Sequence, residues 1–225
     1  MSSHLATILK IFFMAYKLQT TKSGKVFLRG PFAVTGHLNL HPDNLIKLRS
    51  TLYSLLSRIA NSLPLRKPAL ISGLAEGADL LVAEEALRAG WFVDAALALP
   101  VDELIDDYSI EGRDCFFRLL RLCRNVVVVS EAHVLRPDCY VRISEYLREV
   151  AFSLFAVWDG FASDLPGGTA DTIRIFTQPM EFLPEHYDER WGLEIGDMRD
   201  RCLAGINCFQ IDQQRTLIHI PARRL

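Results

Sequence analysis

The sequence lacks an excess of positive charge. Its 225 residues contain 25 Lys and Arg against 27 Asp and Glu, which gives a formal net charge of −2 at pH 7 and a pI near 6.3. Proteins whose affinity depends on neutralising many phosphates usually carry a clearly basic surface. The charge balance therefore argues against nucleic acid as a partner.

Paired cysteines and metal-ligand spacings are also missing. The five cysteines are an odd number, form no CxxC pair and have no neighbouring histidine at metal spacing: Cys115, Cys123, Cys139, Cys202 and Cys208. This usage is typical of reduced thiols in a cytoplasmic protein. We expect no disulfide framework, no metal site and a cytoplasmic location.

No apolar run reaches the roughly 20 residues that a membrane-spanning helix needs. The run IFFMAY near the N-terminus comes directly after Lys10, follows no basic region and precedes no small-residue cleavage site, unlike the core of a signal peptide. We expect no membrane contact, and we interpret residues 1–25 as a short helix or an extension that precedes the domain.

What the sequence does contain is a large apolar fraction in a regular alternation. Hydrophobic residues make up 50% of the chain. From residue 26 onward, short apolar runs alternate with helical patterns, which is typical of a parallel sheet with crossover helices. The alternation predicts strands at 31–35, 69–72, 92–99, 125–130, 152–158 and 216–220.

Two of the intervening helices have clear boundaries. In the stretch 42–64, leucines recur at steps of three and four, which predicts an amphipathic helix with Asp43 as its N-cap. The stretch 78–89 has a similar apolar stripe, and Gly90 is placed to end that helix. These patterns predict an α/β fold, namely a Rossmann-like, doubly wound, mostly parallel sheet of about six strands with helices on both faces.

The segment 179–214 breaks the alternation because its polarity is mixed and has no clear period. It is longer than an ordinary connection between a helix and a strand. We therefore expect a single domain over 26–225 with an insertion at about 179–214, which contains a short helix and acts as a lid or a partner surface.

Small and polar residues follow the predicted strands. In a parallel sheet, ligands bind beyond the carboxyl ends of the strands, near the point where the strand order reverses. We therefore expect one ligand-binding edge formed by Thr35, Gly36 and His37, by the stretch 72–79, by Pro100 and by Asp159 with Gly160.

Two glycine turns contribute to this edge. Gly73 and Gly77 lie in SGLAEGAD, where they permit positive φ and a close approach of ligand atoms, and the amides of the following helix favour an anion. The turn PGGT, with Gly167, Gly168 and Thr169, also opens a helix. One such turn can serve chain geometry alone, but two at one edge favour a site for the anionic group of a nucleotide.

Several acidic and basic side chains here have two interpretations. His37 can donate to a phosphate or act as an acid or base, or it can bond nearby backbone. Glu76 and Asp79 can complement the helix dipole, with Asp79 holding the turn, or they can contact a ribose hydroxyl. Asp159 ends an apolar strand and should emerge at the ligand edge, whereas the acidic run at 102–107 is interpreted as a solvated helix face rather than a magnesium site.

The stretches AVTGHLNL, LISGLAEGADLLVAEEAL, LALPVDELIDDY, LFAVWDG and GGTAD, in this order, resemble the SLOG superfamily of Rossmann-like domains, particularly a bacterial branch with a TGH and LAEGAD pattern. The resemblance covers roughly residues 30–178, and LIHI matches the last strand. The superfamily is named for DNA-processing protein A and the Lonely Guy phosphoribohydrolase, and many members are thought to sense nucleotides. The resemblance implies a pocket that includes Thr35, Gly36, His37, Ser72, Gly73, Leu74, Glu76, Gly77, Asp79, Pro100, Asp159, Gly160, Gly167, Gly168 and Thr169.

The chain departs from the family patterns at functional positions. Arg174 stands where the PGGxGTxxE pattern of the phosphoribohydrolase has its catalytic Glu, and Ala170 stands where that pattern has a Gly. Leu38 follows His37 where the branch usually has Arg, so Arg29 or Arg174 would have to supply that cation. The first departure weighs against glycosidic hydrolysis by the Glu-dependent mechanism.

The leading interpretation is a domain that binds, and thereby senses, a nucleotide or nucleotide-derived ligand and reports it through a signalling partner or a homo-oligomer. One alternative is hydrolysis of the N-glycosidic bond of a nucleoside or nucleotide, with Asp159 or Glu76 as the catalytic carboxylate. A second alternative, single-stranded DNA binding, conflicts with the acidic charge balance. No cofactor other than such a ligand is expected.

Overall fold

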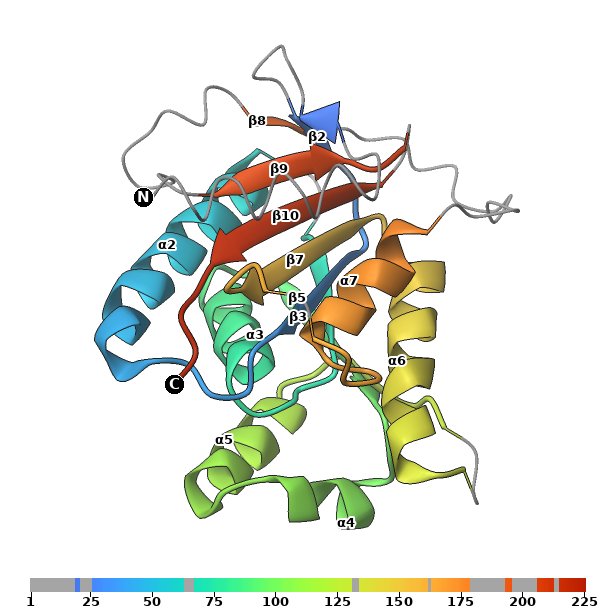
Figure 1. The fold of residues 1–225 in the computed structure, drawn as a ribbon. Helices are drawn as coiled ribbons and strands as arrows, with labels where there is room; N and C mark the ends of the chain where they lie inside the picture. Colours follow the sequence, from blue (N-terminus) through green and yellow to red (C-terminus); the bar gives the residue numbers. More distant parts are fainter. Residues whose placement is uncertain are drawn as a thin grey trace.

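A central sheet lies between two groups of helices in the computed structural model (Figure 1). The structure describes residues 19–20, 26–62, 67–130, 134–161, 163–178, 193–195, 206–212 and 215–225, and only the backbone of 19–20, 26–27 and 193–195. In chain order the elements are β1 (Gln19–Thr20), β2 (Val26–Leu28), β3 (Phe32–Gly36), α2 (Pro42–Asn61), β4 (Ala69–Ser72), α3 (Ala78–Arg88), β5 (Phe92–Leu97), α4 (Val101–Leu104), the 3-10 helix η1 (Ile105–Asp107), α5 (Ile110–Leu120), β6 (Asn125–Val128), α6 (Arg136–Val150), β7 (Ser153–Trp158), α7 (Thr169–Thr177), β8 (Leu193–Ile195), β9 (Asn207–Gln210) and β10 (Thr216–Pro221).

The main sheet has the strand order β1-β9-β10-β7-β3-β4-β5-β6. The six strands from β10 to β6 are parallel neighbours, whereas β9 runs antiparallel to β10 and β1 antiparallel to β9. These six parallel strands are the six that the apolar runs predict. The predicted α/β, Rossmann-like, mostly parallel fold is therefore confirmed.

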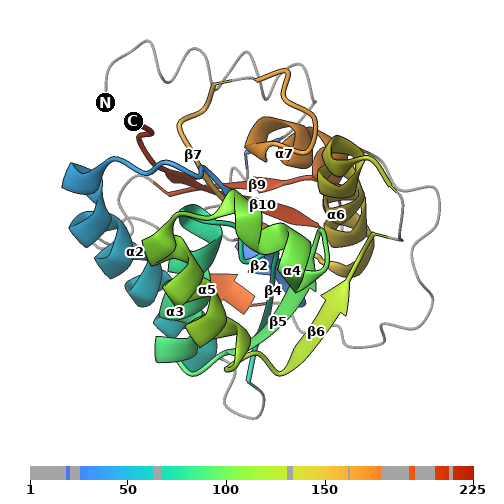
Figure 2. The same cartoon turned by 90° about the horizontal axis from the view of Figure 1, so that it is seen from below.

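Helices cover both faces of the sheet. Side chains alternate between the two faces along each strand, so an apolar strand packs against helices on both sides. Phe32 and Val34 pack into one apolar cluster with α2, α3 and α5, whereas Ala33 between them packs into a second cluster with α6 and α7. Figure 2 shows these two helix groups on opposite sides of the sheet. The strand order reverses at β3, whose neighbours are β4 on one side and β7 on the other.

The boundaries of the two predicted helices are found close to their expected places. The predicted cap of α2 is wrong, however: His41 is the N-cap, and its Nδ1 accepts a hydrogen bond from the Asp43 amide at 3.3 Å. The reason is Pro42, which occupies the first helical position and moves Asp43 into the first turn. Gly90 follows α3 with φ of 83°, as predicted.

Parts of the two expected appendages join the domain. β9, inside the expected insertion, extends the main sheet beside β10, and β1, inside the expected N-terminal extension, pairs with β9. β8, also within the insertion, pairs with β2 in a separate two-stranded sheet. The short helix expected within 179–214 lies outside the described residues. No helix in the described part of the chain is long and apolar enough to cross a membrane.

Candidate functional site

The carboxyl ends of the six parallel strands form one edge of the sheet, toward which Figure 2 looks. At this edge β3 and β7 lie side by side where the strand order reverses, the position at which open parallel sheets bind ligands. His37 follows β3 and Asp159 follows β7. The imidazole Nε2 of His37 lies 3.1 Å from Asp159 Oδ1, and both side chains are about nine-tenths buried, at 10% and 12% exposure.

His37 has two neighbours that require different protonation states of the same nitrogen. The backbone amide of Asp159 donates to Nε2 at 3.0 Å, which requires the lone pair of a neutral imidazole. The Asp159 carboxylate, 3.1 Å from the same atom, would instead accept a proton from it. The structure therefore places a donor and an acceptor, both from Asp159, against one nitrogen of the His37 imidazole.

Arg224 contacts the carboxylate of this pair from its other side. Arg224 Nε lies 3.1 Å from Asp159 Oδ2, so the carboxylate lies between an imidazole and a guanidinium. Asp159 Oδ1 also accepts from the Phe161 amide at 3.0 Å. The sequence prediction missed Arg224, because 65 residues separate it from Asp159 and no local pattern joins the two.

The first glycine turn, residues 72–79, holds an anion that belongs to the chain itself. The amides of Gly73 and Ala75 and the hydroxyl of Ser72 donate to the Asp79 carboxylate, which confirms that Asp79 holds the turn. The Ser72 hydroxyl in turn accepts from the Leu74 amide at 3.0 Å. Leu74 takes a φ of 53°, a value that is uncommon outside glycine.

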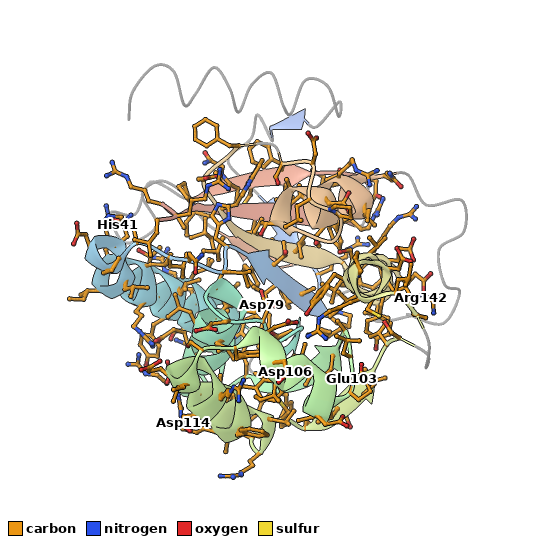
Figure 3. All side chains as sticks on the ribbon, turned by 60° about the horizontal axis from the view of Figure 1, so that its bottom comes forward. His41, Asp79, Glu103, Asp106, Asp114 and Arg142 are labelled. Carbon is orange, nitrogen blue, oxygen red and sulfur yellow. The ribbon has the colours of Figure 1, made fainter. Side chains whose placement is uncertain are left out.

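Burial dominates the electrostatics of this turn. Desolvation raises the pKa of Asp79 to about 7, against the opposing effect of its hydrogen bonds. Burial also raises the pKa of Tyr108, with a smaller contribution from the Asp79 charge, and its hydroxyl donates to the Leu74 carbonyl at 2.7 Å. Figure 3 shows Asp79 near the centre of the molecule, whereas Glu103 and Asp106 lie on the α4–η1 segment, where both are exposed.

Two of the glycines at this edge are required by protein packing, which corrects the expectation that their open side serves a ligand. A Cβ on Gly77 would lie 2.0 Å from the Leu38 carbonyl oxygen, and φ at Gly77 is 87°. A Cβ on Gly36 would lie 2.4 Å from that of Ala78. At Gly73 the space is wider, with Ile143 Cδ1 at 3.1 Å and Asp79 Oδ2 at 3.2 Å.

Glu76 caps a different helix from the one expected. Its carboxylate accepts from the Ser109 amide at 2.8 Å and from the Ser109 hydroxyl at 2.5 Å, at the N-terminus of α5. The carboxylate also fills the space beside Gly112, where a Cβ would lie 2.6 Å from Glu76 Cδ. Glu76 thereby joins the first glycine turn to α5, and its carboxylate is already hydrogen-bonded.

The second glycine turn also holds a carboxylate of its own helix. The Gly167 amide donates to Asp171 Oδ2 at 2.8 Å, and Arg174 Nε donates to Asp171 Oδ1 at 2.9 Å. Arg174 thus lies along α7, while Arg29 precedes β3 and donates its amide to the Ser153 hydroxyl at the opposite edge of the sheet. Within the described residues the Thr169 hydroxyl, which is half-buried, makes no hydrogen bond.

Both glycine turns pack against α6. A Cβ on Gly73 would meet Ile143, and a Cβ on Gly167 would lie 2.4 Å from the Cβ of Tyr140, one turn earlier on the same helix. The two turns therefore lie at one edge of the sheet and beside one helix, as their positions after parallel strands require.

The predicted site residues fall into two groups by accessibility. Thr35, Ser72, Leu74, Asp79 and Gly160 are buried. The others are partly or fully accessible: Gly36, His37, Gly73, Glu76, Gly77, Pro100, Asp159, Gly167, Gly168 and Thr169. Within the described residues no group of His, Cys, Asp and Glu side chains could hold a metal ion.

Comparison with protein-family models and with curated proteins finds no match. Among solved structures, the X-ray structure of DNA processing protein A from Streptococcus pneumoniae matches with 19% sequence identity and a TM-score of 0.27. The match covers 65% of this chain and 55% of that chain, so it spans little more than half of that protein's length. We therefore base the Rossmann-like assignment on the strand order and the helix placement.

Proposed function

We propose that this domain binds a nucleotide or a nucleotide-derived ligand at the carboxyl edge of its sheet, beside β3 and β7. The observation that carries the proposal is the nearly buried His37–Asp159 pair, 3.1 Å apart at the point where the strand order reverses. Polar side chains that converge where open sheets bind ligands are typical of a small-molecule site.

Each part of the edge suits one part of a nucleotide. The Asp159 carboxylate is an acceptor for sugar hydroxyls, and the His37 imidazole can donate to a phosphate when it is protonated. The N-terminus of α7 has a glycine as its N-cap, so no side chain of that residue occupies the first-turn amides. Together with the Thr169 hydroxyl, these amides favour an anionic group.

The neighbouring carboxylates favour binding over catalysis as the first function. Glu76 already accepts hydrogen bonds from Ser109, the N-cap of α5, and Arg174 stands where the phosphoribohydrolase pattern has its Glu. The His37–Asp159 contact, an imidazole beside a carboxylate, favours hydrolysis of an N-glycosidic bond as the second candidate. The two functions can be distinguished because only hydrolysis consumes water and releases free base together with the sugar or sugar phosphate.

The test is thermal unfolding with AMP, ADP, ATP and GMP, together with chromatography of the same mixtures for free base. A ligand at 100 times its dissociation constant should stabilise the fold by about 2.7 kcal/mol. We expect stabilisation without base release, and loss of that stabilisation in Asp159→Asn. The matched control is Asp94→Asn, the same exchange at a carboxylate on β5 that is held by Arg124 and Asn125. Stabilisation that survives in Asp159→Asn would contradict the assigned site.

A further inference from the structure

Residues 222–225 cross the end of β7 and reach the loop that follows β3. The Ala222 amide donates to the Trp158 carbonyl at 3.1 Å, and the Leu225 amide donates to the Asn39 carbonyl at 3.1 Å. Arg224 forms an antiparallel bridge with Leu40. Figure 1 shows the chain descending from β10 to this loop, next to the start of α2.

This path takes a cation directly to the point where the strand order reverses. Arg224 Nε contacts Asp159 Oδ2 at 3.1 Å, on the oxygen that His37 does not contact. The Arg224 side chain is 54% exposed, so water and salt screen this ion pair, and another donor can replace it. The adjacent Arg223 is also exposed, and its carbonyl accepts from the His41 amide at 2.9 Å, whereas its side chain makes no hydrogen bond or ion pair with Asp159 or any other described residue.

We propose that residues 222–225 are a built-in occupant of the sheet edge at which β3 and β7 end, which a ligand must displace from Asp159 in order to bind. This inference rests on the proposed function for its ligand. It adds that residues 222–225 regulate ligand binding. A ligand replaces the guanidinium with donors of its own, and any event that withdraws residues 222–225 opens the site.

The test compares the full chain with Arg224→Gln, which removes the guanidinium but keeps the backbone pairing with Leu40. Arg223→Gln is the matched control, because it removes an equal charge one residue away without touching Asp159. Hydrogen exchange of the peptide that contains Ala222 and Leu225 should be about two- to fivefold faster in Arg224→Gln alone, the range expected for a partly exposed ion pair. Binding of AMP, followed by calorimetry, should tighten by about two- to fivefold in the same variant, since a smaller fraction of molecules is closed.

The two measurements separate this inference from the function on which it rests. Equal AMP affinity in the full chain and in Arg224→Gln overturns the occupant. If neither the full chain nor any variant binds AMP, ADP, ATP or GMP, the proposed function fails. Hydrogen exchange then decides by itself whether Arg224 holds residues 222–225 in place. Unchanged exchange in Arg224→Gln, or equal acceleration in Arg223→Gln, overturns the inference by itself. The Arg224→Lys variant keeps the charge, so its exchange rate and its AMP affinity should lie between those of the full chain and those of Arg224→Gln.

Discussion

In both the turn between β4 and α3 and the turn before α7, a backbone amide binds an Asp carboxylate. The two carboxylates differ in their other partners. In each turn a glycine amide donates to an Asp from the first turn of the following helix, Asp79 in one and Asp171 in the other. Asp79 is buried and receives only amides and a hydroxyl, whereas Asp171 is paired with the half-exposed Arg174. The same type of contact, a glycine amide on an Asp of the following helix, thus produces one buried, proton-sensitive carboxylate and one ion pair.

This difference teaches that a glycine-rich turn before a helix need not be waiting for an external anion. Amides that point into such a turn bind whichever anion is nearest, and here the chain supplies it. The carboxylate at this edge that combines partial exposure with an imidazole partner is Asp159. For this reason the proposed ligand lies at the boundary between β3 and β7, with its anionic group beside the first-turn amides of α7.

The largest expected effect breaks the first turn by steric overlap. Gly77→Ala would place a Cβ 2.0 Å from the Leu38 carbonyl oxygen at a φ of 87°. Strain and overlap together should cost about 5 kcal/mol or more of unfolding free energy, enough to unfold many domains. Gly167→Ala, beside Tyr140, should behave similarly in the second turn.

Gly90→Ala is the matched control for this prediction. Gly90 has a similar φ of 83°, but a Cβ there would meet nothing within 4 Å. Its substitution should therefore cost only the backbone strain of about 1 to 2 kcal/mol. Urea unfolding of the three variants measures the difference directly. Equal losses at Gly77 and Gly90 would show that packing against Leu38 contributes nothing.

The second effect concerns pH and arises in the first turn. The Asp79 carboxyl ionises near pH 7 in the folded protein, but near pH 4 in the unfolded chain. Between these values the folded state holds the additional proton, so the free energy of unfolding should fall as the pH rises, by about 4 kcal/mol in total.

Unfolding of the unchanged protein and of Asp79→Asn at several pH values measures that contribution, because the amide does not titrate. The stability difference between the two proteins should change in favour of the variant between about pH 4 and about pH 7 and remain constant above this range. Asp171→Asn provides the same chemical exchange in the second turn. A difference that favours the unchanged protein more as the pH rises would contradict the buried, proton-binding role of Asp79.

Local sequence patterns predicted those parts of the fold that depend on local signals. Apolar runs located the six parallel strands, and the position of Asp79 at a helix start indicated that it holds its turn. Contacts between distant segments have no such signal. The Glu76 carboxylate accepts from Ser109, 33 residues away, and Arg224 pairs with Asp159. Only the folded structure reveals these two contacts. β9 was missed because its four residues lie in a segment without clear periodicity.

A smaller effect tests how the first turn is joined to α5. Glu76→Gln keeps an acceptor for Ser109 but removes the negative charge at the N-terminus of α5, and should cost about 1 kcal/mol. Hydrogen exchange should show the loss in the first turn of α5 rather than in α3. Uniform faster exchange across both helices would indicate that Glu76 stabilises the glycine turn itself.

The smallest effect is expected at the second turn. Asp171→Asn keeps an acceptor for the Gly167 amide and loses the ion pair with Arg174, whose side chain is 45% exposed. Such pairs contribute little, so the loss should be about 0.5 kcal/mol and should diminish further at high salt. Thermal unfolding at low and high salt measures both. A loss comparable to that of Gly77→Ala would make the two turns equally dependent on their carboxylates.

The central claim is that the ligand binds at the boundary of β3 and β7 while the glycine turns keep their own carboxylates. Titration of the 15N-labelled full chain with AMP, ADP, ATP and GMP, followed by amide chemical shifts, tests this claim most directly. We predict that one or more of these nucleotides shifts the amides of His37, Asp159 and Thr169, while the amides of Gly73 and Ala75 stay where they are. Shifts centred on Gly73 and Ala75, or no shift with any of the four nucleotides, would contradict it.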